Sequence, residues 1–291
     1  MKPAVSTYSF QSLIDSGRLS QLECVRKAKE MGFEGIEIMG LYHGPEEDDR
    51  SYAARLAEEC RAAGMPVVCF TVGANLLCAT EEETQAEIAR LKEMADLAAL
   101  LGAPRMRHDA AWGFGSIPRE GRGFDQVVGS LADTCREVSD YAVQRGVETM
   151  VENHGYFCQD SRRVEKLVNL VGREHYGVLC DIGNFCCVDE APAVAAGRLA
   201  PYVKYVHCKD FHWRSGDEDA PGEGFMRTRG GNYIRGAVLG HGNVPVRRCL
   251  SALRSGGYDG WVGIEFEGME DPIRALEIGL ANLKRFLASV E

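Results

Sequence analysis

The sequence predicts an α/β protein in which eight strand–helix units close into one barrel. A helical stretch, a glycine and a short β-rich run return along the chain in that order, as in "AKEMGFEGIEIM", "LAALLGAPRMRH" and "YAVQRGVETMVE". Short apolar strands separated by helices imply a parallel sheet, and eight such units favour a closed barrel. No Gly-, Pro- or Ser-rich linker divides the sequence. We therefore expect a single (β/α)8 TIM barrel domain over residues 1–291.

Eight β-rich runs are predicted as the barrel strands. Their ranges are 4–9, 35–39, 66–71, 104–108, 148–152, 176–180, 202–207 and 261–266. Glycines suited to the left-handed residue that ends a helix precede five of these runs. They are Gly32, Gly64, Gly102, Gly146 and Gly257.

Core-facing stripes of apolar residues predict the helices between the strands. One stripe consists of Ile88, Leu91, Ala95 and Ala98, and the last consists of Ile273, Leu276, Leu280, Leu283 and Leu287. The last helix is expected to begin with Asp271 as its N-cap and Pro272 at its first position.

The connection after the seventh strand, at about 210–242, is predicted to be long and irregular. Loops of that length are usually functional or mobile. In a barrel of this type, it would overhang the active face.

Composition narrows the class of protein. The net charge of -10 argues against a nucleic-acid partner, because phosphate binding normally requires clustered Lys and Arg. The sequence shows neither a signal peptide nor an apolar run of membrane-spanning length, so we expect no membrane partner and a cytoplasmic location. The 11 cysteines are expected to be reduced core residues, since their number is odd and two of them are adjacent.

Four ligand-type residues stand at the ends of the last four predicted strands. They are Glu152 in "VENHG", Asp181 in "CDIGN", His207 in "VHCKDFH" and Glu265 in "GIEFEG". Because barrel chemistry is built at the carboxyl edge of the strands, we expect these side chains to meet there. Three carboxylates and one imidazole suit a single divalent ion such as Mn²⁺, Mg²⁺ or Co²⁺, with Zn²⁺ also possible. The ion would pair the carboxylate of Glu152, whose burial is otherwise costly.

At these motifs the chain resembles the sugar isomerase and epimerase barrels similar to xylose isomerase, a family that also includes inosose dehydratases. The resemblance runs through essentially the whole chain and is carried by "VENHG", "CDIGN", "VHCKDFH" and "YDGWVGIEFEG". It implies that Glu152, Asp181, His207 and Glu265 bind one divalent metal, and that Glu152 and Glu265 also transfer protons. It further implies a homo-oligomer, a dimer or tetramer.

The reaction expected from this resemblance is metal-dependent isomerisation or epimerisation of a sugar or sugar phosphate. A proton next to a carbonyl is removed, and the metal stabilises the ene-diolate. Candidate substrate-binding residues are His108, His154, Asn184, Lys209 and Arg214. Trp112 and Phe114 could stack on a sugar ring or a larger aromatic group. The role of His241 in "LGHGNVPV" stays open, because the family usually has an acidic residue there.

Three alternatives share the barrel. A metal-dependent lyase or dehydratase would act by β-elimination on a keto-sugar, an inosose or a 3-keto-glycoside. A DNA repair nuclease similar to endonuclease IV would need a histidine on the third strand, which "CFTVGANL" lacks. A non-catalytic barrel subunit would keep the fold without the reaction, and the intact set of four ligand-type residues argues against it.

Overall fold

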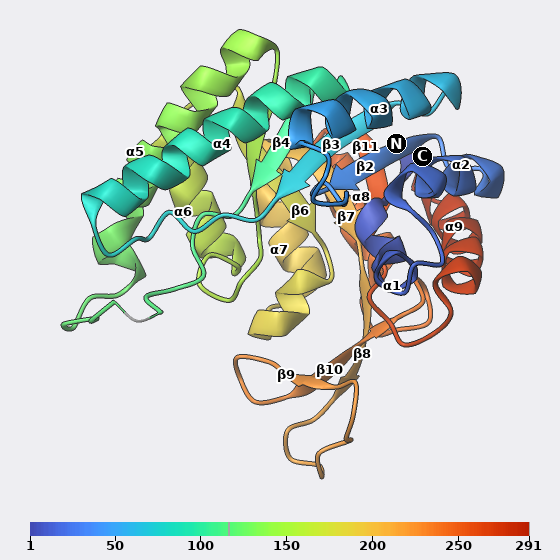
Figure 1. Cartoon of the computed structure of the whole chain (residues 1–291). Helices are drawn as coiled ribbons and strands as arrows, with labels where there is room; N and C mark the ends of the chain where they lie inside the picture. Colours follow the sequence, from blue (N-terminus) through green and yellow to red (C-terminus); the bar gives the residue numbers. More distant parts are fainter. Residues whose placement is uncertain (116, 291) are drawn as a thin grey trace.

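The barrel closes as a ring of parallel strands (Figure 1). The computed structural model describes residues 1–115 and 117–290. The strands are β1 (Lys2–Ser6), β2 (Gly35–Met39), β3 (Val67–Val72), β4 (Arg105–His108), β5 (Glu148–Glu152), β6 (Tyr176–Asp181), β7 (Val203–Cys208) and β11 (Trp261–Ile264). Their order around the ring is β1-β11-β7-β6-β5-β4-β3-β2. The predicted (β/α)8 barrel is confirmed.

Helices cover the outside of this ring. The longer ones are α2 (Gln21–Met31), α3 (Asp49–Ala62), α4 (Glu81–Leu101), α5 (Phe124–Ala142), α6 (Ser161–Val171), α7 (Pro192–Leu199), α8 (Val246–Ser255) and α9 (Pro272–Ala288). The short ones are α1 (Gln11–Asp15) and the 3-10 turns η1 (Thr7–Phe10), η2 (Val143–Arg145), η3 (Asn184–Val188) and η4 (Ala200–Tyr202). All five predicted helix-ending glycines have positive φ.

The predicted helix faces are confirmed, with one residue less buried than the rest. Every stripe residue is buried except Ile273, which is partly buried. Asp271 caps α9 by accepting a hydrogen bond from the backbone N–H of Arg274 at 3.1 Å, and Pro272 is the first helical residue.

The first strand is shifted from its prediction. It was expected at 4–9, but β1 ends at Ser6, whose hydroxyl accepts from the backbone N–H of Tyr8 at 3.3 Å and starts η1. Thr7, Ser9 and Phe10 are buried in that turn, so the run reads as a strand although it is not extended. β11 likewise ends at Ile264, two residues before the end of its predicted range.

The interior of the barrel is built in layers. An apolar floor is formed by Ala4, Val68, Cys69, Met150, Leu179 and Tyr205. Because side chains alternate across a strand, the residues two positions after Met150, Leu179 and Tyr205 also point inward. Those residues are Glu152, Asp181 and His207, and they lie one layer above the floor, toward the carboxyl ends of the strands.

The long connection after β7 is not irregular, as was expected, but contains a small antiparallel sheet. It has the order β8-β10-β9, with β8 (Asp210–Arg214), β9 (Met226–Arg227) and β10 (Tyr233–Ala237), and projects from the carboxyl end of the barrel (Figure 1). The Asp189 carboxylate holds the sheet to the barrel by accepting from Thr228 Oγ1 at 2.8 Å and Asn232 Nδ2 at 2.7 Å. The prediction rested on the length of the segment, which does not reveal strand pairing.

The cysteines are free thiols, and most are buried. Burial raises the pKa of several of them, for example that of Cys24 to about 12. Within residues 1–115 and 117–290, no helix has the combined length and apolar character that a membrane span requires.

Asp210 fastens the turn before α8. Its buried carboxylate accepts the backbone N–H groups of Phe211 at 2.9 Å, Gly240 at 2.8 Å, Gly242 at 2.9 Å and Val244 at 3.0 Å. His241 lies within this turn with its side chain exposed. The turn is therefore shaped by Asp210 rather than by His241.

We predict that Asp210→Ala lowers the free energy of unfolding by about 2–4 kcal/mol, because it leaves buried N–H groups without their acceptor. Urea denaturation followed by circular dichroism measures this loss. Asp217→Ala, at an exposed position in the loop between β8 and β9, serves as the control and should change stability by less than about 0.5 kcal/mol. Equal stability of the two variants would contradict the clamp.

Candidate metal centre

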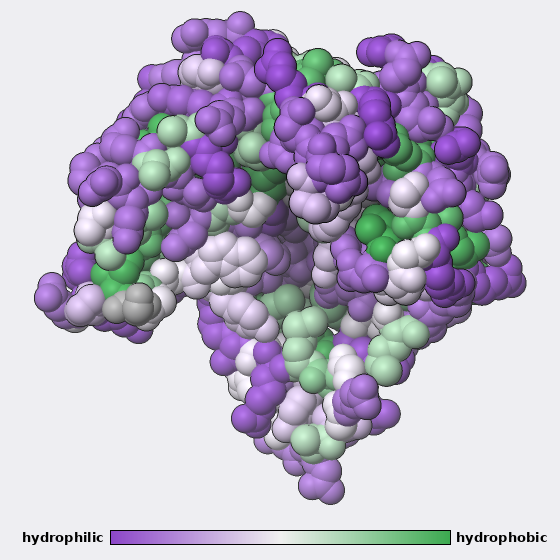
Figure 2. Space-filling model, viewed as in Figure 1, coloured by the Kyte–Doolittle hydropathy of each residue, from purple (hydrophilic) through white to green (hydrophobic). Residues whose placement is uncertain are grey.

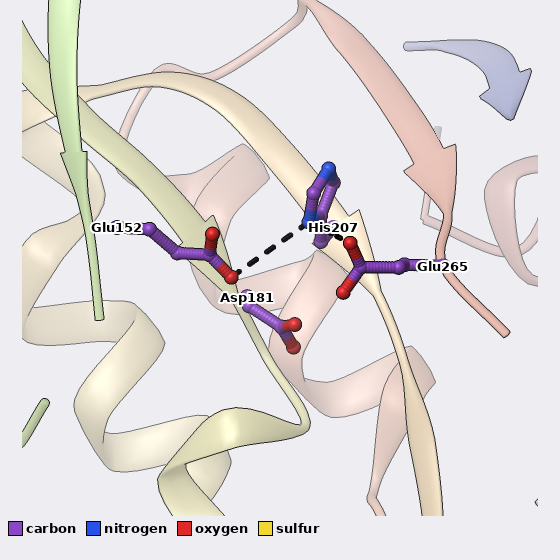
Figure 3. Close-up of side chains that lie close together, drawn as sticks. All are labelled: Glu152, Asp181, His207 and Glu265. Carbon is purple, nitrogen blue, oxygen red and sulfur yellow. Dashed lines mark ion pairs between the residues drawn. The ribbon is translucent and has the colours of Figure 1, made fainter. Parts of the chain in front are cut away.

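Four side chains from adjacent barrel strands converge at the carboxyl end of the barrel (Figure 3). Glu152 ends β5, Asp181 ends β6, His207 lies in β7 and Glu265 follows β11. Each offers one ligand atom, and these atoms lie within 4.8 Å of one another. All four side chains are buried, Glu265 being the most exposed at 8%. In the described part of the chain, this is the single group of three or more His, Cys, Asp or Glu residues that could share an ion.

His207 is held from behind by a second buried carboxylate. Its Nε2 lies 2.5 Å from Glu37 Oε2, and Glu37 Oε1 in turn accepts from the hydroxyl of Ser6 at 2.9 Å. The other nitrogen, Nδ1, therefore faces the cluster, 3.8 Å from Glu152 Oε1 and 3.6 Å from Glu265 Oε1. A carboxylate behind an imidazole is the usual support of a metal-binding histidine.

Asp181 presents one oxygen to the protein and one to the cluster. Oδ1 accepts the backbone N–H groups of Gly183 at 2.8 Å and Asn184 at 3.1 Å. Burial raises the pKa of this carboxyl to about 6; Lys209 opposes the rise, and Glu152 adds to it. Without a metal ion, Asp181 is therefore ionised above about pH 6 and protonated below it.

Glu152 is kept ionised by its neighbours. Oε2 pairs with Arg107 at 2.7 Å, and Oε1 accepts from Asn184 Nδ2 at 3.0 Å. Burial alone would raise the pKa of Glu152, but Arg107 and then His207 hold it well below its usual range. Arg107 therefore offsets part of the cost of burying the Glu152 carboxylate.

Lys209 is the second buried cation of the site. Its Nζ lies 2.6 Å from Glu265 Oε2, 3.2 Å from Glu267 Oε2 and 3.3 Å from Asp181 Oδ2. Burial would lower the pKa of Lys209, but these carboxylates, Glu265 foremost, raise it well above its usual value. Lys209 is thus a fixed positive charge at the edge of the cluster.

The residues present fit a divalent cation. His207 Nδ1 and Asp181 Oδ2 are buried atoms that lack a hydrogen-bond partner in the described residues, and both belong to the cluster, although Lys209 Nζ lies 3.3 Å from Asp181 Oδ2. Burying such atoms without a hydrogen bond costs free energy, which an ion between them would recover. Oxygen and imidazole donors suit Mg²⁺, Mn²⁺, Co²⁺ or Zn²⁺.

A cavity of about 300 Å³ opens onto the cluster, here called the inner cavity. Its lining residues are Tyr8, Met39, Thr71, Arg107, Trp112, Glu152, His154, Lys209, Glu265 and Glu267. On one wall, His154 Nδ1 lies 3.0 Å from Asp109 Oδ1, and Asp109 also pairs with Arg107 at 2.8 Å. A chain of ion pairs thus connects His154 to Glu152 through two buried side chains, Asp109 and Arg107.

The structure brings three of the five predicted substrate-binding residues to the site. His154 and Lys209 line the inner cavity, whereas Asn184 lies behind it and contacts Glu152. His108 is wrongly placed by the prediction: it is fully buried and packs beside Tyr176, with ring centroids 6.1 Å apart. Arg214 is exposed and pairs with Glu218 at 3.5 Å, so it does not join the cluster either.

The error at β4 follows from strand alternation. Consecutive residues point to opposite faces, so His108 points outward and Arg107 points into the barrel. Glu37 was not among the predicted site residues, although it is, like Glu152, a carboxylate that follows apolar residues, in the run "GIEIM".

A family model described as Xylose isomerase-like TIM barrel matches residues 25–286. Among curated proteins, an inosose dehydratase from Lacticaseibacillus casei is 25% identical over 148 residues, which is 50% of this chain and 48% of the relative. The chain therefore aligns with about half the length of that relative. The rhizopine catabolism protein MocC of Rhizobium meliloti is 24% identical over 290 residues, covering 92% of this chain and 82% of the relative.

Solved structures share the fold at lower identity. The IOLI protein with a bound zinc atom matches with a TM-score of 0.78 and 18% identity, covering 100% of this chain and 99% of that one. The 3-keto-D-glucoside 4-epimerase YcjR of E. coli matches with a TM-score of 0.70 and 19% identity, covering 98% and 99%.

We predict that Arg107→Met lowers the free energy of unfolding by about 3–5 kcal/mol, because it removes the guanidinium that pairs with two buried carboxylates, Glu152 and Asp109. Arg105→Met is the matched control on the same strand. Arg105 pairs with Glu148 at 3.4 Å near the surface, and its loss should cost less than about 1 kcal/mol. Chemical denaturation of both variants measures these losses. Similar losses in the two variants would contradict the explanation that buried charge makes Arg107 important.

Proposed function

The chain belongs to the xylose isomerase-like TIM barrel family, and on this premise we propose that it is a divalent-metal-dependent isomerase or epimerase of a keto-sugar. The observation that carries the proposal is the pair of buried carboxylates, Glu152 and Glu265, on either side of His207 (Figure 3). Such a pair can remove a proton from one face of a carbon and return it on the other.

Glu152, Asp181, His207 and Glu265 are the residues we propose as ligands of one ion. When bound, a divalent cation supplies Lewis acidity, which polarises a carbonyl and stabilises the negative charge that develops on its oxygen. Glu37 acts behind the ligand set, because it fixes the orientation of His207.

The two carboxylates are prepared for proton transfer by different cations. Arg107 keeps Glu152 ionised, and Lys209 keeps Glu265 ionised, its pKa being lowered against the effect of burial. Each can therefore accept a proton from a carbon next to a carbonyl, and the configuration of the substrate decides which one does so. If the other carboxylate, after taking a proton from water, delivers it to the opposite face of the same carbon, the product is an epimer. If the first carboxylate delivers its proton to the neighbouring carbon, the product is an isomer.

A second candidate function, β-elimination, is favoured by His154. This histidine faces the inner cavity and is oriented by Asp109 at 3.0 Å. Burial alone would lower the pKa of His154, but Asp109 raises it above its usual value. A protonated imidazole there could protonate a leaving oxygen, as a dehydratase or lyase requires. The similarity to an inosose dehydratase supports the same candidate.

We predict that the Glu152→Gln variant, with its ion bound, loses proton exchange at the substrate carbon by at least about 100-fold, because its amide cannot accept the proton. Incubation with ketoses, inososes and 3-keto-glycosides in deuterated water, followed by mass spectrometry, measures the exchange. Glu148→Gln is the control: Glu148 begins the same strand and pairs with Lys204 at 2.6 Å, outside the cluster.

The products separate the two candidates. Deuterium incorporation without loss of mass supports the isomerase or epimerase, whereas loss of water or of an aglycone supports elimination. Full exchange in the Glu152→Gln variant would remove Glu152 from the mechanism.

We also predict that ion binding releases protons in a pH-dependent way. Without an ion, Glu37 and Glu265 raise the pKa of His207 well above its usual value against the effect of burial, and Asp181 has a pKa of about 6. Binding near pH 7.5 should therefore release about one proton, from His207, and binding near pH 5.5 about two, because Asp181 is then protonated as well.

Calorimetric titration with Mn²⁺ in buffers of different ionisation enthalpy counts these protons. Asp181→Asn should abolish the increase at the lower pH. A proton count that does not change between the two pH values would contradict the assignment of Asp181 as a ligand.

A further inference from the structure

The side chain of Trp112 is held by specific contacts but remains largely exposed to solvent. Its indole N–H donates to the carbonyl of Ala74 at 2.9 Å, and its ring meets the edge of His154 with centroids 4.9 Å apart and planes at 81°. Even so, 54% of the residue is exposed. A large aromatic side chain that is fixed but bare is typical of a ligand-binding surface.

The glycine of "VENHG" makes room for this ring. Gly155 has φ of 77°, and a Cβ there would lie 3.3 Å from Cε3 of Trp112. A larger residue would therefore be strained by its backbone and pressed against the indole. The position of Trp112 is thus determined by the loop after β5 as well as by its own loop.

Trp112 separates the inner cavity from a second one, here called the outer cavity. The outer cavity has a volume of about 450 Å³ and is also lined by Trp112. Its other aromatic walls are Phe114, Phe124, Tyr156 and Phe157. Figure 2 shows the molecule hollowed between the barrel and the projecting small sheet. The ring of Trp112 is the element common to both cavities.

The two cavities differ in chemistry. The inner one carries three carboxylates among its lining residues, whereas the described lining of the outer one includes no Asp, Glu, Asn or Gln. The three guanidinium groups of the outer cavity each have a protein partner. Arg163 donates to the carbonyl of Phe157 at 2.8 Å, Arg119 donates to the carbonyl of Arg122 at 3.3 Å, and Arg229 pairs with Asp160 at 3.1 Å. Sugar hydroxyls would find few partners there, but a flat aromatic ring would find stacking surfaces.

We propose that the substrate is an aryl keto-glycoside, whose keto-sugar occupies the inner cavity and whose aromatic ring stacks on Trp112 and enters the outer cavity. The proposal rests on the proposed function, because it takes the inner cavity as the place where the keto-sugar reacts. It assigns the outer cavity as a specificity site for the aglycone.

Binding tests this directly. The probes are 4-nitrophenyl 3-keto-β-D-glucoside and methyl 3-keto-β-D-glucoside, titrated into the Mn²⁺-loaded Glu152→Gln variant so that neither is consumed. We expect the aryl glycoside to bind at least about tenfold more tightly, which is the scale of one good aromatic contact. Adding Trp112→Ala or Tyr156→Ala should reduce this preference, with little effect on the methyl glycoside for Tyr156→Ala.

Trp213→Ala is the matched control, since Trp213 is a similarly exposed tryptophan, at 44%, on β8. Equal affinity for the two glycosides, no binding of the aryl one, or a preference that survives both substitutions would overturn the proposal. If the preference appears as expected but wild-type protein exchanges no deuterium into either glycoside, the proposed reaction fails while the aglycone site stands.

Discussion

The structure depends on the pairing of several carboxylates that are buried at the carboxyl end of the barrel. Glu37, Glu152, Asp181 and Glu265 are all buried, and isolated buried charges are strongly unfavourable. Each is therefore tied to a partner: Arg107 to Glu152, Lys209 to Glu265 and Asp181, and His207 to Glu37. The positions of the charged side chains follow from this requirement.

The geometry of the barrel allows each buried carboxylate to reach an oppositely charged partner. The apolar floor fills the lower interior, and the next inward-pointing layer supplies both the acids and their partners. Close approaches depend on glycine. A Cβ on Gly183 would lie 2.7 Å from the carbonyl oxygen of Lys209, and the hydroxyl of Tyr205 occupies the space where Gly263 would carry one.

Much of the architecture could be predicted because each strand–helix unit repeats a local signal. The convergence of Glu152, Asp181, His207 and Glu265 could also be predicted, since the carboxyl ends of parallel strands meet. The sequence did not reveal whether an individual strand residue points into or out of the barrel. Inward and outward positions differ by a single step, so His108 was chosen where Arg107 faces the site.

Long-range partners were equally hidden. Glu37 and His207 are 170 residues apart, and only the closed ring brings them into contact. Asp210 stands in a charged run, yet it binds backbone groups about 30 residues further along the chain. The small sheet depends on Asp189, which the sequence presents as an ordinary acidic residue before a helix.

The ammonium group of Lys209 affects whether the barrel can fold without a metal ion. Because it lies within 3.3 Å of three carboxylates, it provides a built-in counter-charge before any ion arrives. The polypeptide can therefore complete its barrel in the absence of metal, unlike small domains whose folding energy comes from the ion itself. Binding of the proposed ion would then take place on a finished scaffold and would not be a step of folding.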